Sequence, residues 1–461
     1  MSQSNIPTLK HRVFRAGTWT IAGYGTSQVI RFASNLVMTR LVVPEMFGVM
    51  SIAMMLILGI SLFSDIGLRQ SIVQSQRGED QDFLNTAWST QIIRSVFICV
   101  MAALLGLILY IAQHMGWVPL DSVYTDTSLP FVISVLSFAV LIGGFESTNL
   151  AVASRKLELG RIAILEIAGQ FFGVIVMIGW ALLSKSIWAL VAAAIASALL
   201  RVYLSHTIFS GVKNHWHWDT HAFKEIIGMG KWIFLSSILG FILNSGDRLL
   251  LSSMVSSKVL GIYSISFLIL GAFNLGISKL ISSVCYSAIS EVVRAHADYT
   301  ERLREIYYKF MVPTDLILFF LSGLFFTFGP SIIHLLYDSR YQDAQWMLQI
   351  LSFSLIGIRF EIAGYCYLAI GKPRFLTLLT CARMAGLYIS VPVAFHFFGI
   401  HGALWAISLA FLSGAPIVYY LNYQLGIFMW KRELQTLPAF VVGGGLGKLF
   451  IWILAMRVTA G

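Results

Sequence analysis

Ten charged side chains stand out because they lie inside long apolar stretches of the sequence. They are six arginines and four carboxylates: Arg31, Arg94, Arg201, Arg248, Arg359, Arg383, Glu146, Glu166, Asp247 and Glu361. An ionisable group at membrane depth costs several kcal/mol unless it faces protein or water. Ten such groups cost too much to face lipid together, so we expect them to line an internal, wet space.

The excess of arginine over carboxylate predicts what this space binds. A mildly cationic cavity suits an anionic group, and the planar fork of a guanidinium suits phosphate. A second interpretation stays open. The charged groups would then pair with one another or extend to the membrane surface, and would serve only to hold helices together.

The composition indicates an integral membrane protein. Of the 461 residues, 57% are hydrophobic and 12% are charged, whereas a soluble chain has roughly 25% charged residues. The net charge of +10 does not indicate a nucleic-acid partner, because Lys and Arg lie between apolar runs, where they set topology and meet headgroups. The four cysteines lie in apolar runs without a C-x-x-C pair, so we expect them to pack as small hydrophobic residues.

The elements that position these groups are predicted to be membrane helices, since about 20 apolar residues cross about 30 Å of hydrocarbon. We expect an all-α integral membrane protein, with an extra C-terminal helix after twelve others. The apolar runs cover 17–41, 45–64, 87–112, 129–153, 162–184, 187–209, 231–252, 258–283, 308–329, 346–370, 374–396, 401–423 and 437–457. Two charged connections, 65–86 and 285–307, are predicted to form amphipathic helices at the inner headgroups.

Charge in the connections predicts the orientation. Connections on the side of the N-terminus hold eighteen Lys and Arg residues, and those on the other side hold five. Because cytoplasmic loops carry the excess of positive charge, we expect the N-terminus in the cytoplasm and the end of the thirteenth helix outside.

The chain also contains a weak internal repeat. Gly17–Ala53 aligns without a gap on Gly230–Ser266, and Arg31 and Asn35 take the places of Asn244 and Arg248. We therefore predict a six-helix lobe over 1–220, a second over 221–424 and the extra helix within 425–461. Two lobes of six helices would be related by a pseudo-two-fold axis along the membrane normal, with a site where they meet.

Two short motifs invite other chemistry. His215–His221 is rich in His and Trp, but its spacing is not that of a zinc site, so we expect an interfacial cytoplasmic loop and no metal. Gly443–Lys448 lacks the spacing of a phosphate loop and lies in an apolar run, so we expect close helix packing, as for Gly169 and Gly173. No nucleophile–base arrangement is visible, and we expect no enzyme.

Four passages together resemble the polysaccharide transporter branch of the multidrug/oligosaccharidyl-lipid/polysaccharide exporter superfamily. Within that branch the chain is similar to the Wzx-type flippases of the colanic acid exporter group. The passages are Thr39–Gly48, Phe63–Gln74, Arg155–Glu158, and Gly246–Leu251 with Leu260–Ser264. The resemblance covers about residues 10–425.

This resemblance implies a flippase of the bacterial inner membrane that moves undecaprenyl-diphosphate-linked oligosaccharide from the cytoplasmic to the periplasmic leaflet by alternating access. It implies contact with bilayer lipids, with the polymerase and chain-length proteins of the export pathway, and no cofactor beyond a proton or sodium gradient. For the diphosphate we expect Arg31, Asn35, Arg248 and Arg359, then Arg94, Arg201 and Arg383. For coupling or gating we expect Asp247, Glu361, Asp65, Lys279 and Glu146, although Asp65 and Lys279 suit a helix-end role equally well.

Three alternatives remain at this point. A multidrug or cation antiporter of the same superfamily would prefer carboxylates and aromatic faces in its cavity, which the excess of arginine disfavours. A lipid II flippase shares the problem of moving a diphosphate lipid. A membrane-embedded glycosyltransferase would need a catalytic acid and large loops outside the membrane, and the longest outer loops here, near 113–128 and 330–345, are short.

Overall fold

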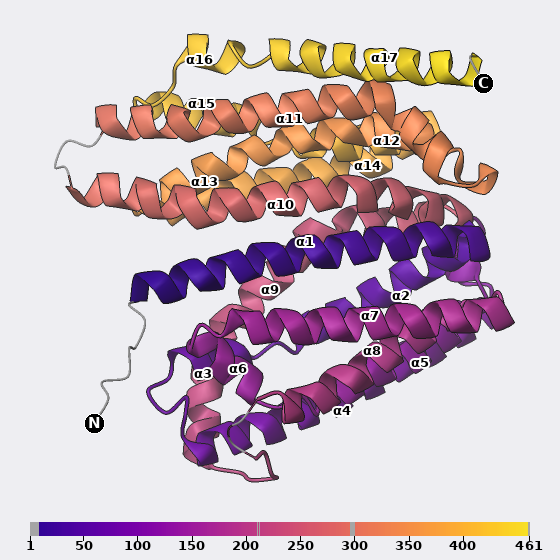
Figure 1. The fold of residues 1–461 in the computed structure, drawn as a ribbon, viewed down its shortest axis with the longest axis vertical. Coiled ribbons are helices and arrows are strands. Elements are labelled where there is room, and N and C mark those ends of the chain that lie inside the picture. Colours follow the sequence, from indigo (N-terminus) through magenta and orange to yellow (C-terminus); the bar gives the residue numbers. More distant parts are fainter. Residues whose placement is uncertain (1–8, 210, 212, 296–299, 460–461) are drawn as a thin grey trace. The chain divides into compact units, whose positions relative to one another are not determined.

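The computed structural model describes residues 9–209, 211, 213–295 and 300–459. Within these residues the chain is helical and contains no strand, which confirms the all-α prediction (Figure 1). All thirteen predicted runs fall on helices. Nine helical stretches of the described chain are long and apolar enough to cross a membrane. The protein is therefore a multi-pass membrane protein.

The contacts divide the chain into two compact units. The first comprises Met1–Ile242 and Ser252–Lys258, and the second Leu243–Leu251 and Val259–Gly461. The predicted lobe boundaries stay a prediction. Helices of the first unit are α1 (Leu9–Leu41), α2 (Pro44–Phe63), α3 (Leu68–Gln74), α4 (Gln81–His114), α5 (Leu129–Gly143), α6 (Asn149–Arg155), α7 (Leu159–Leu183) and α8 (Trp188–Thr207), with the 3-10 turn η1 (Val123–Thr125) and the start of α9 (Thr220–Met254).

The predicted span 129–153 is two helices, α5 and α6. Gly144 ends α5 where α4 approaches it, since a Cβ at Gly144 would lie 2.0 Å from the Ser95 hydroxyl oxygen. The amide of Gln91 on α4 donates to the carbonyls of Gly144 at 3.0 Å and Glu146 at 3.1 Å. A break at membrane depth needs partners of this kind, because no water satisfies its backbone groups.

The second unit holds the remaining helices and the end of α9. They are α10 (Ser257–Ala295), α11 (Thr300–Leu336), α12 (Ala344–Leu351), α13 (Phe360–Ala369), α14 (Pro373–Ala410), α15 (Ala415–Gln424), α16 (Trp430–Leu434) and α17 (Pro438–Thr459), with the 3-10 turns η2 (Ser339–Tyr341) and η3 (Ser352–Arg359). Gly399 divides α14 into two limbs, with φ 60° and ψ −150°. This turn separates the predicted spans 374–396 and 401–423, because L residues rarely adopt a positive φ.

Glycines bring helices into close contact in both units, as predicted. A Cβ at Gly443 of α17 would lie 2.1 Å from the Phe320 carbonyl oxygen of α11, and one at Gly323 of α11 would lie 2.1 Å from that of Phe440. Figure 1 shows α11 and α17 side by side along their length. In the first unit, a Cβ at Gly173 of α7 would lie 2.9 Å from the Ala193 carbonyl oxygen of α8.

The connections differ in part from the sequence prediction. Residues 65–86 do contain a short helix, α3, but no separate surface helix covers the described part of 285–307. There α10 continues to Ala295 and α11 begins at Thr300, so the spaced apolar residues of this stretch extend two membrane helices. Ile289, for example, is buried.

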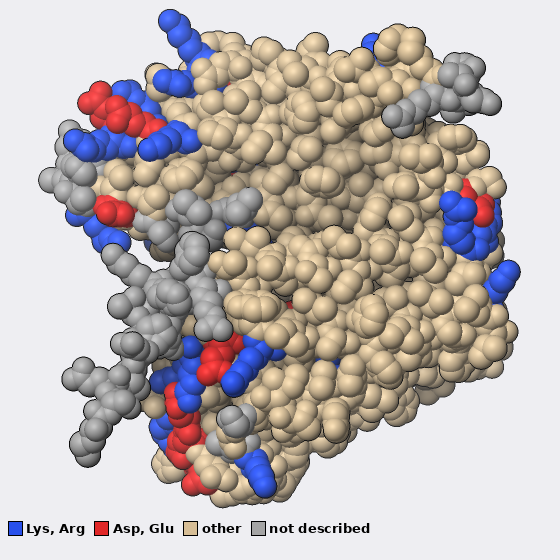
Figure 2. Space-filling model, in the orientation of Figure 1, with Lys and Arg blue, Asp and Glu red and all other residues tan. Residues whose placement is uncertain are grey.

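Charged side chains gather at the ends of the helices. On the face drawn in Figure 2, Lys, Arg, Asp and Glu lie mostly toward the left of the view, and the surface between the two ends is almost free of them. This distribution is typical of a chain whose middle faces hydrocarbon. The side chains of Lys10, Arg12, Arg15, Trp232 and Arg457 lie outside what the structure describes.

Candidate functional site

Two of the predicted arginines keep their guanidinium groups accessible. Arg248, in the second unit, lies over the ring of Phe267, with its Cζ 4.6 Å from the ring centroid. Its side chain is 26% exposed, and its buried Nε has no hydrogen-bond partner among the described residues. Arg31 of α1, in the first unit, is exposed. The amide oxygen of Asn35, one turn further along α1, is buried and has no hydrogen-bond partner in the described structure.

Asp247 is buried beside Arg248 and belongs to the packing of the second unit. Its carboxylate accepts a hydrogen bond from the hydroxyl of Tyr263 on α10, and its Oδ1 lies 3.9 Å from Nε of Arg248. The preceding residue, Gly246, packs on α14, because a Cβ there would lie 2.8 Å from the hydroxyl oxygen of Tyr388. Tyr263 and α14 therefore hold the backbone that carries Arg248.

Arg359 is placed differently. It is 6% exposed at the end of η3, and its Nη2 contacts Asp315 Oδ2 at 2.8 Å and Glu433 Oε2 at 2.5 Å. Both carboxylates are buried, and Tyr308 donates to Glu433 Oε1 at 3.0 Å. This arrangement favours the interpretation in which membrane charges hold helices together. Headgroup contact by Arg359 stays a prediction that this geometry does not support.

Sequence reasoning missed both partners of Arg359. Asp315 lies inside the predicted span 308–329 and could have been found there by the same criterion as the other charged residues. Glu433 lies in α16, in a polar stretch before the last apolar run, and nothing in the sequence around it indicates a buried partner.

The three lower-ranked arginines are each engaged within one unit. Arg94 donates to the Ser61 carbonyl at 2.7 Å and Arg201 contacts Glu146 at 3.1 Å, both in the first unit. Arg383, in the second unit, donates to the Gly357 carbonyl at 3.3 Å. Nε of both Arg201 and Arg383 is buried without a hydrogen-bond partner among the described residues. These groups have fewer donors left for a ligand than Arg31 and Arg248.

The remaining gating candidates lie in separate places. Glu361 accepts a hydrogen bond from Ser278 at 3.1 Å and attracts Arg383. Asp65 follows the end of α2, where its carboxylate accepts from the backbone N–H of Gly67 at 3.0 Å, as expected of a helix-end residue. Lys279 is exposed on α10, which continues well beyond it to Ala295.

The His- and Trp-rich segment, His215–His221, is hydrogen-bonded through its backbone to the first turns of α4. Its backbone N–H groups donate to three α4 side chains: His215 to Asn85 at 3.2 Å, His217 to Ser89 at 3.1 Å and Asp219 to Thr86 at 3.0 Å. The backbone N–H of His221 and the guanidinium of Arg77 lower the pKa of Asp219. In the part of the chain that the structure describes, no cluster of His, Cys, Asp and Glu could hold a metal.

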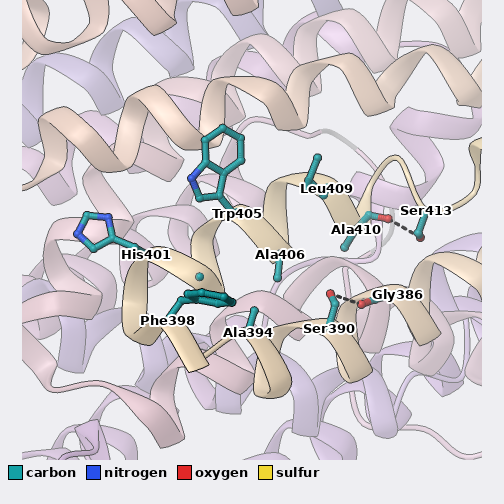
Figure 3. Close-up of a pocket in the computed structure, with 11 residues that line it drawn as sticks. Gly386, Ser390, Ala394, Phe398, His401, Trp405, Ala406, Leu409, Ala410 and Ser413 are labelled. Carbon is teal, nitrogen blue, oxygen red and sulfur yellow. Dashed lines mark hydrogen bonds between the residues drawn. The ribbon is translucent and has the colours of Figure 1, made fainter. Parts of the chain in front are cut away.

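A groove of about 620 Å³ lies between the two limbs of α14 (Figure 3). Its lining is almost entirely apolar, and the hydroxyls of its two serines already have partners, since Ser390 donates to the Gly386 carbonyl and Ser413 to that of Ala410 at 2.7 Å. His401 at one end stacks on Trp346, with ring centroids 3.9 Å apart. An anionic headgroup would find no charged partner in this groove.

Comparison with known proteins gives a family match over most of the chain. Residues 37–345 match the family described as polysaccharide biosynthesis protein. This range is more than half of the 461 residues and lies within the stretch that carries the sequence resemblance.

Individual relatives are distant. A membrane protein in the cps region of Klebsiella pneumoniae is 23% identical over 66% of this chain and 60% of its own length. The lipopolysaccharide biosynthesis protein WzxC of Escherichia coli strain K12 is 20% identical over 75% of this chain and 67% of its own length. A Shigella flexneri protein provisionally named an O-antigen transporter is 21% identical over 90% of this chain and 98% of its own length. The chain thus spans less than two thirds of the first of these relatives.

Solved structures share the fold. The lipid II flippase MurJ in an inward closed conformation gives a TM-score of 0.67 at 13% identity, over 96% of this chain and 93% of that one. An inward-facing multidrug resistance transporter of the MATE family gives 0.61 at 14% identity, over 88% of this chain and 94% of that one. At such identities the likeness concerns the fold alone.

Proposed function

Because the chain belongs to the polysaccharide biosynthesis protein family, we propose that it is a flippase for lipid-linked oligosaccharides. It moves undecaprenyl-diphosphate-linked repeat units from the cytoplasmic to the periplasmic leaflet of a bacterial inner membrane, with its N-terminus in the cytoplasm. The names of the Escherichia coli and Shigella flexneri relatives support this assignment. The polymerase and chain-length proteins of the pathway are its expected neighbours.

The observation that carries the proposal is the state of Arg248. The guanidinium lies over the ring of Phe267, its buried Nε has no hydrogen-bond partner among the described residues, and the carboxylate of Asp247 is 3.9 Å away. A guanidinium in this state is costly to maintain at membrane depth for structure alone. It is well suited to a diphosphate, which accepts two parallel N–H bonds from one guanidinium. Arg248 takes the head of the lipid, whose polyprenyl tail stays in hydrocarbon. Arg31, which is exposed in the first unit, is tested separately.

The test is a deletion strain complemented with variants. Without the protein, lipid-linked repeat units accumulate on the cytoplasmic leaflet and surface polymer is lost. Loss of one charge-assisted contact costs about 1.5–3 kcal/mol, so Arg248→Ala lowers flipping roughly tenfold to a hundredfold at subsaturating substrate. Membrane abundance stays unchanged. Arg248→Lys keeps the charge but not the fork and gives an intermediate loss.

The matched control is Arg304→Ala on α11. Arg304 is a partly exposed arginine near the start of its helix and contacts Glu301 at 3.3 Å, so its removal leaves flipping unchanged. Unchanged flipping in both Arg31→Ala and Arg248→Ala removes these residues from the site. Unchanged export of every surface polymer in the deletion strain refutes the function itself.

Drug resistance separates this proposal from a multidrug antiporter. If deletion changes the susceptibility of the strain to cationic drugs but leaves its lipid-linked sugars unchanged, the protein is a multidrug antiporter and the flippase proposal fails. Rescue of a strain that lacks its lipid II flippase would likewise favour a peptidoglycan precursor as the substrate.

A further inference from the structure

The ion cluster around Arg359 contains more negative than positive groups. Nη2 of Arg359 contacts both Asp315 Oδ2, at 2.8 Å, and Glu433 Oε2, at 2.5 Å. Asp315 is fully buried, and Arg359 and Glu433 are each 6% exposed. If both carboxyls were ionised, two negative charges would share one nitrogen away from water. Like charges at such a distance do not both stay ionised in a buried site.

The hydrogen bonds indicate which carboxyl is neutral. Both oxygens of Glu433 have partners, since Arg359 contacts Oε2 and Tyr308 donates to Oε1 at 3.0 Å. Asp315 has a partner on one side only. Thr436 lies 3.5 Å from its Oδ2, and its Oδ1 is buried with no hydrogen-bond partner among the described residues. An unpartnered neutral oxygen costs much less to bury than an unpartnered charged one.

We propose that Asp315 is a proton-binding site, which holds a proton while α11, η3 and α16 are packed together and releases it when they separate. The ligand is a proton and not a sodium ion. A metal cation needs several oxygen ligands, whereas Oδ1 stands without a described partner and a guanidinium already occupies the other side of the carboxyl.

The charged and titratable groups that face Asp315 are Arg359 on η3, Tyr419 on α15 and Glu433 on α16. Tyr307 and Tyr308 on α11 belong to the same cluster through Glu433 and Arg359. Arg359 provides the cluster with its single positive charge. Loss of the proton therefore leaves a net negative charge that repels Glu433 and loosens α16, and with it α17, from α11. This inference rests on the proposed function in one respect only: it names a proton as the ion that couples to flipping.

Infrared spectroscopy of the purified protein tests the proton directly. We expect the carbonyl band of a protonated side-chain carboxyl at neutral pH, and its loss in Asp315→Asn. Asp247→Asn is the control and keeps the band, because Asp247 is a buried carboxyl that contacts Tyr263 and Arg248 and does not belong to the cluster around Arg359. A band that survives in Asp315→Asn overturns the proposal. If the band is lost in Glu433→Gln but not in Asp315→Asn, the proton lies on Glu433, and this result also overturns the proposal.

Thermal denaturation gives a second, independent measurement. The folded chain holds a proton that an unfolded aspartate has released, so stability falls as pH rises. One retained proton changes the unfolding equilibrium roughly tenfold per pH unit between about pH 5 and the pH at which the folded chain releases the proton. Asp315→Asn removes this slope and stays folded, since an amide replaces a neutral carboxyl. If stability depends on pH with the same slope in wild type and Asp315→Asn, the proposal is contradicted. It is also contradicted if Asp315→Asn fails to fold while Glu433→Gln is stable.

Flipping in vesicles then links the proton to transport. A pH gradient accelerates wild type, and Asp315→Asn flips at the same rate with and without the gradient. If Asp315→Asn still responds to the gradient, Asp315 is not the coupling site. If wild type flips no lipid-linked sugar, the proposed function fails, whereas the infrared band still reports on the proton.

Discussion

Replacement of Gly443 by alanine tests the packing of α17 on α11. The added Cβ would lie 2.1 Å from the carbonyl oxygen and 2.9 Å from the carbonyl carbon of Phe320. Both atoms belong to a helix backbone and cannot rotate away, so α17 must move by about 1 Å before the contact becomes an ordinary one. Overpacking of this kind costs about 1–3 kcal/mol.

Gly445 provides the matched control, because a Cβ there meets nothing within 4 Å. Alanine is better than glycine in a helix by about 1 kcal/mol, so Gly445→Ala is expected to be as stable as wild type or more so. The two variants carry the same added methyl group at positions two residues apart and share the gain in helix propensity, so the expected gap in stability is the overpacking cost of about 1–3 kcal/mol. Thermal denaturation in detergent measures it. Equal stability of the two variants would refute the packing described for these helices.

Two further predictions concern polar contacts between helices. Gln170→Leu removes two hydrogen bonds between α7 and α1. Ser27 Oγ donates to Gln170 Oε1 at 2.6 Å, and Gln170 Nε2 donates to the Ser27 carbonyl at 3.1 Å. It should cost about 1 kcal/mol in a denaturation assay, and no change would mean that lipid or water replaces the contact. Arg359→Met leaves two buried carboxyls without a cation and should cost about 3–5 kcal/mol. Arg304→Met, at an exposed pair, should cost less than about 1 kcal/mol, and equal losses would contradict the burial of Arg359.

The helices could be predicted from the sequence because few backbone conformations are stable across a membrane. An apolar run of sufficient length must satisfy its own backbone groups, and a helix does so locally. The turn at Gly399 could be predicted in the same way, because it separates the apolar runs 374–396 and 401–423. The break between α5 and α6 could not be predicted, because it depends on the amide of Gln91 from another helix.

The candidate site was predictable only as a set of charged residues. The sequence singles out Arg31, Arg248 and Arg359 by the same criterion, depth in an apolar run. The structure separates them by their partners, and the partners of Arg359 come from α11 and α16, far away in the chain. Such long-range pairing has no local pattern, so the role of each arginine is a tertiary property. Headgroup binding by Arg31 and Arg248 stays a prediction.

The segment after α8 has a consequence for biosynthesis. Asn85, Thr86 and Ser89 are fully buried, and each bonds to a backbone N–H group that follows more than 120 residues later in the chain. While the ribosome is still making α8, the oxygens of these three side chains lack the backbone N–H groups from which they accept in the folded chain, and a buried polar atom without its partner is unfavourable. The nascent first unit therefore stays open at this end until residue 219 has emerged. A product that stops after α8 should be recognised and degraded by membrane quality control.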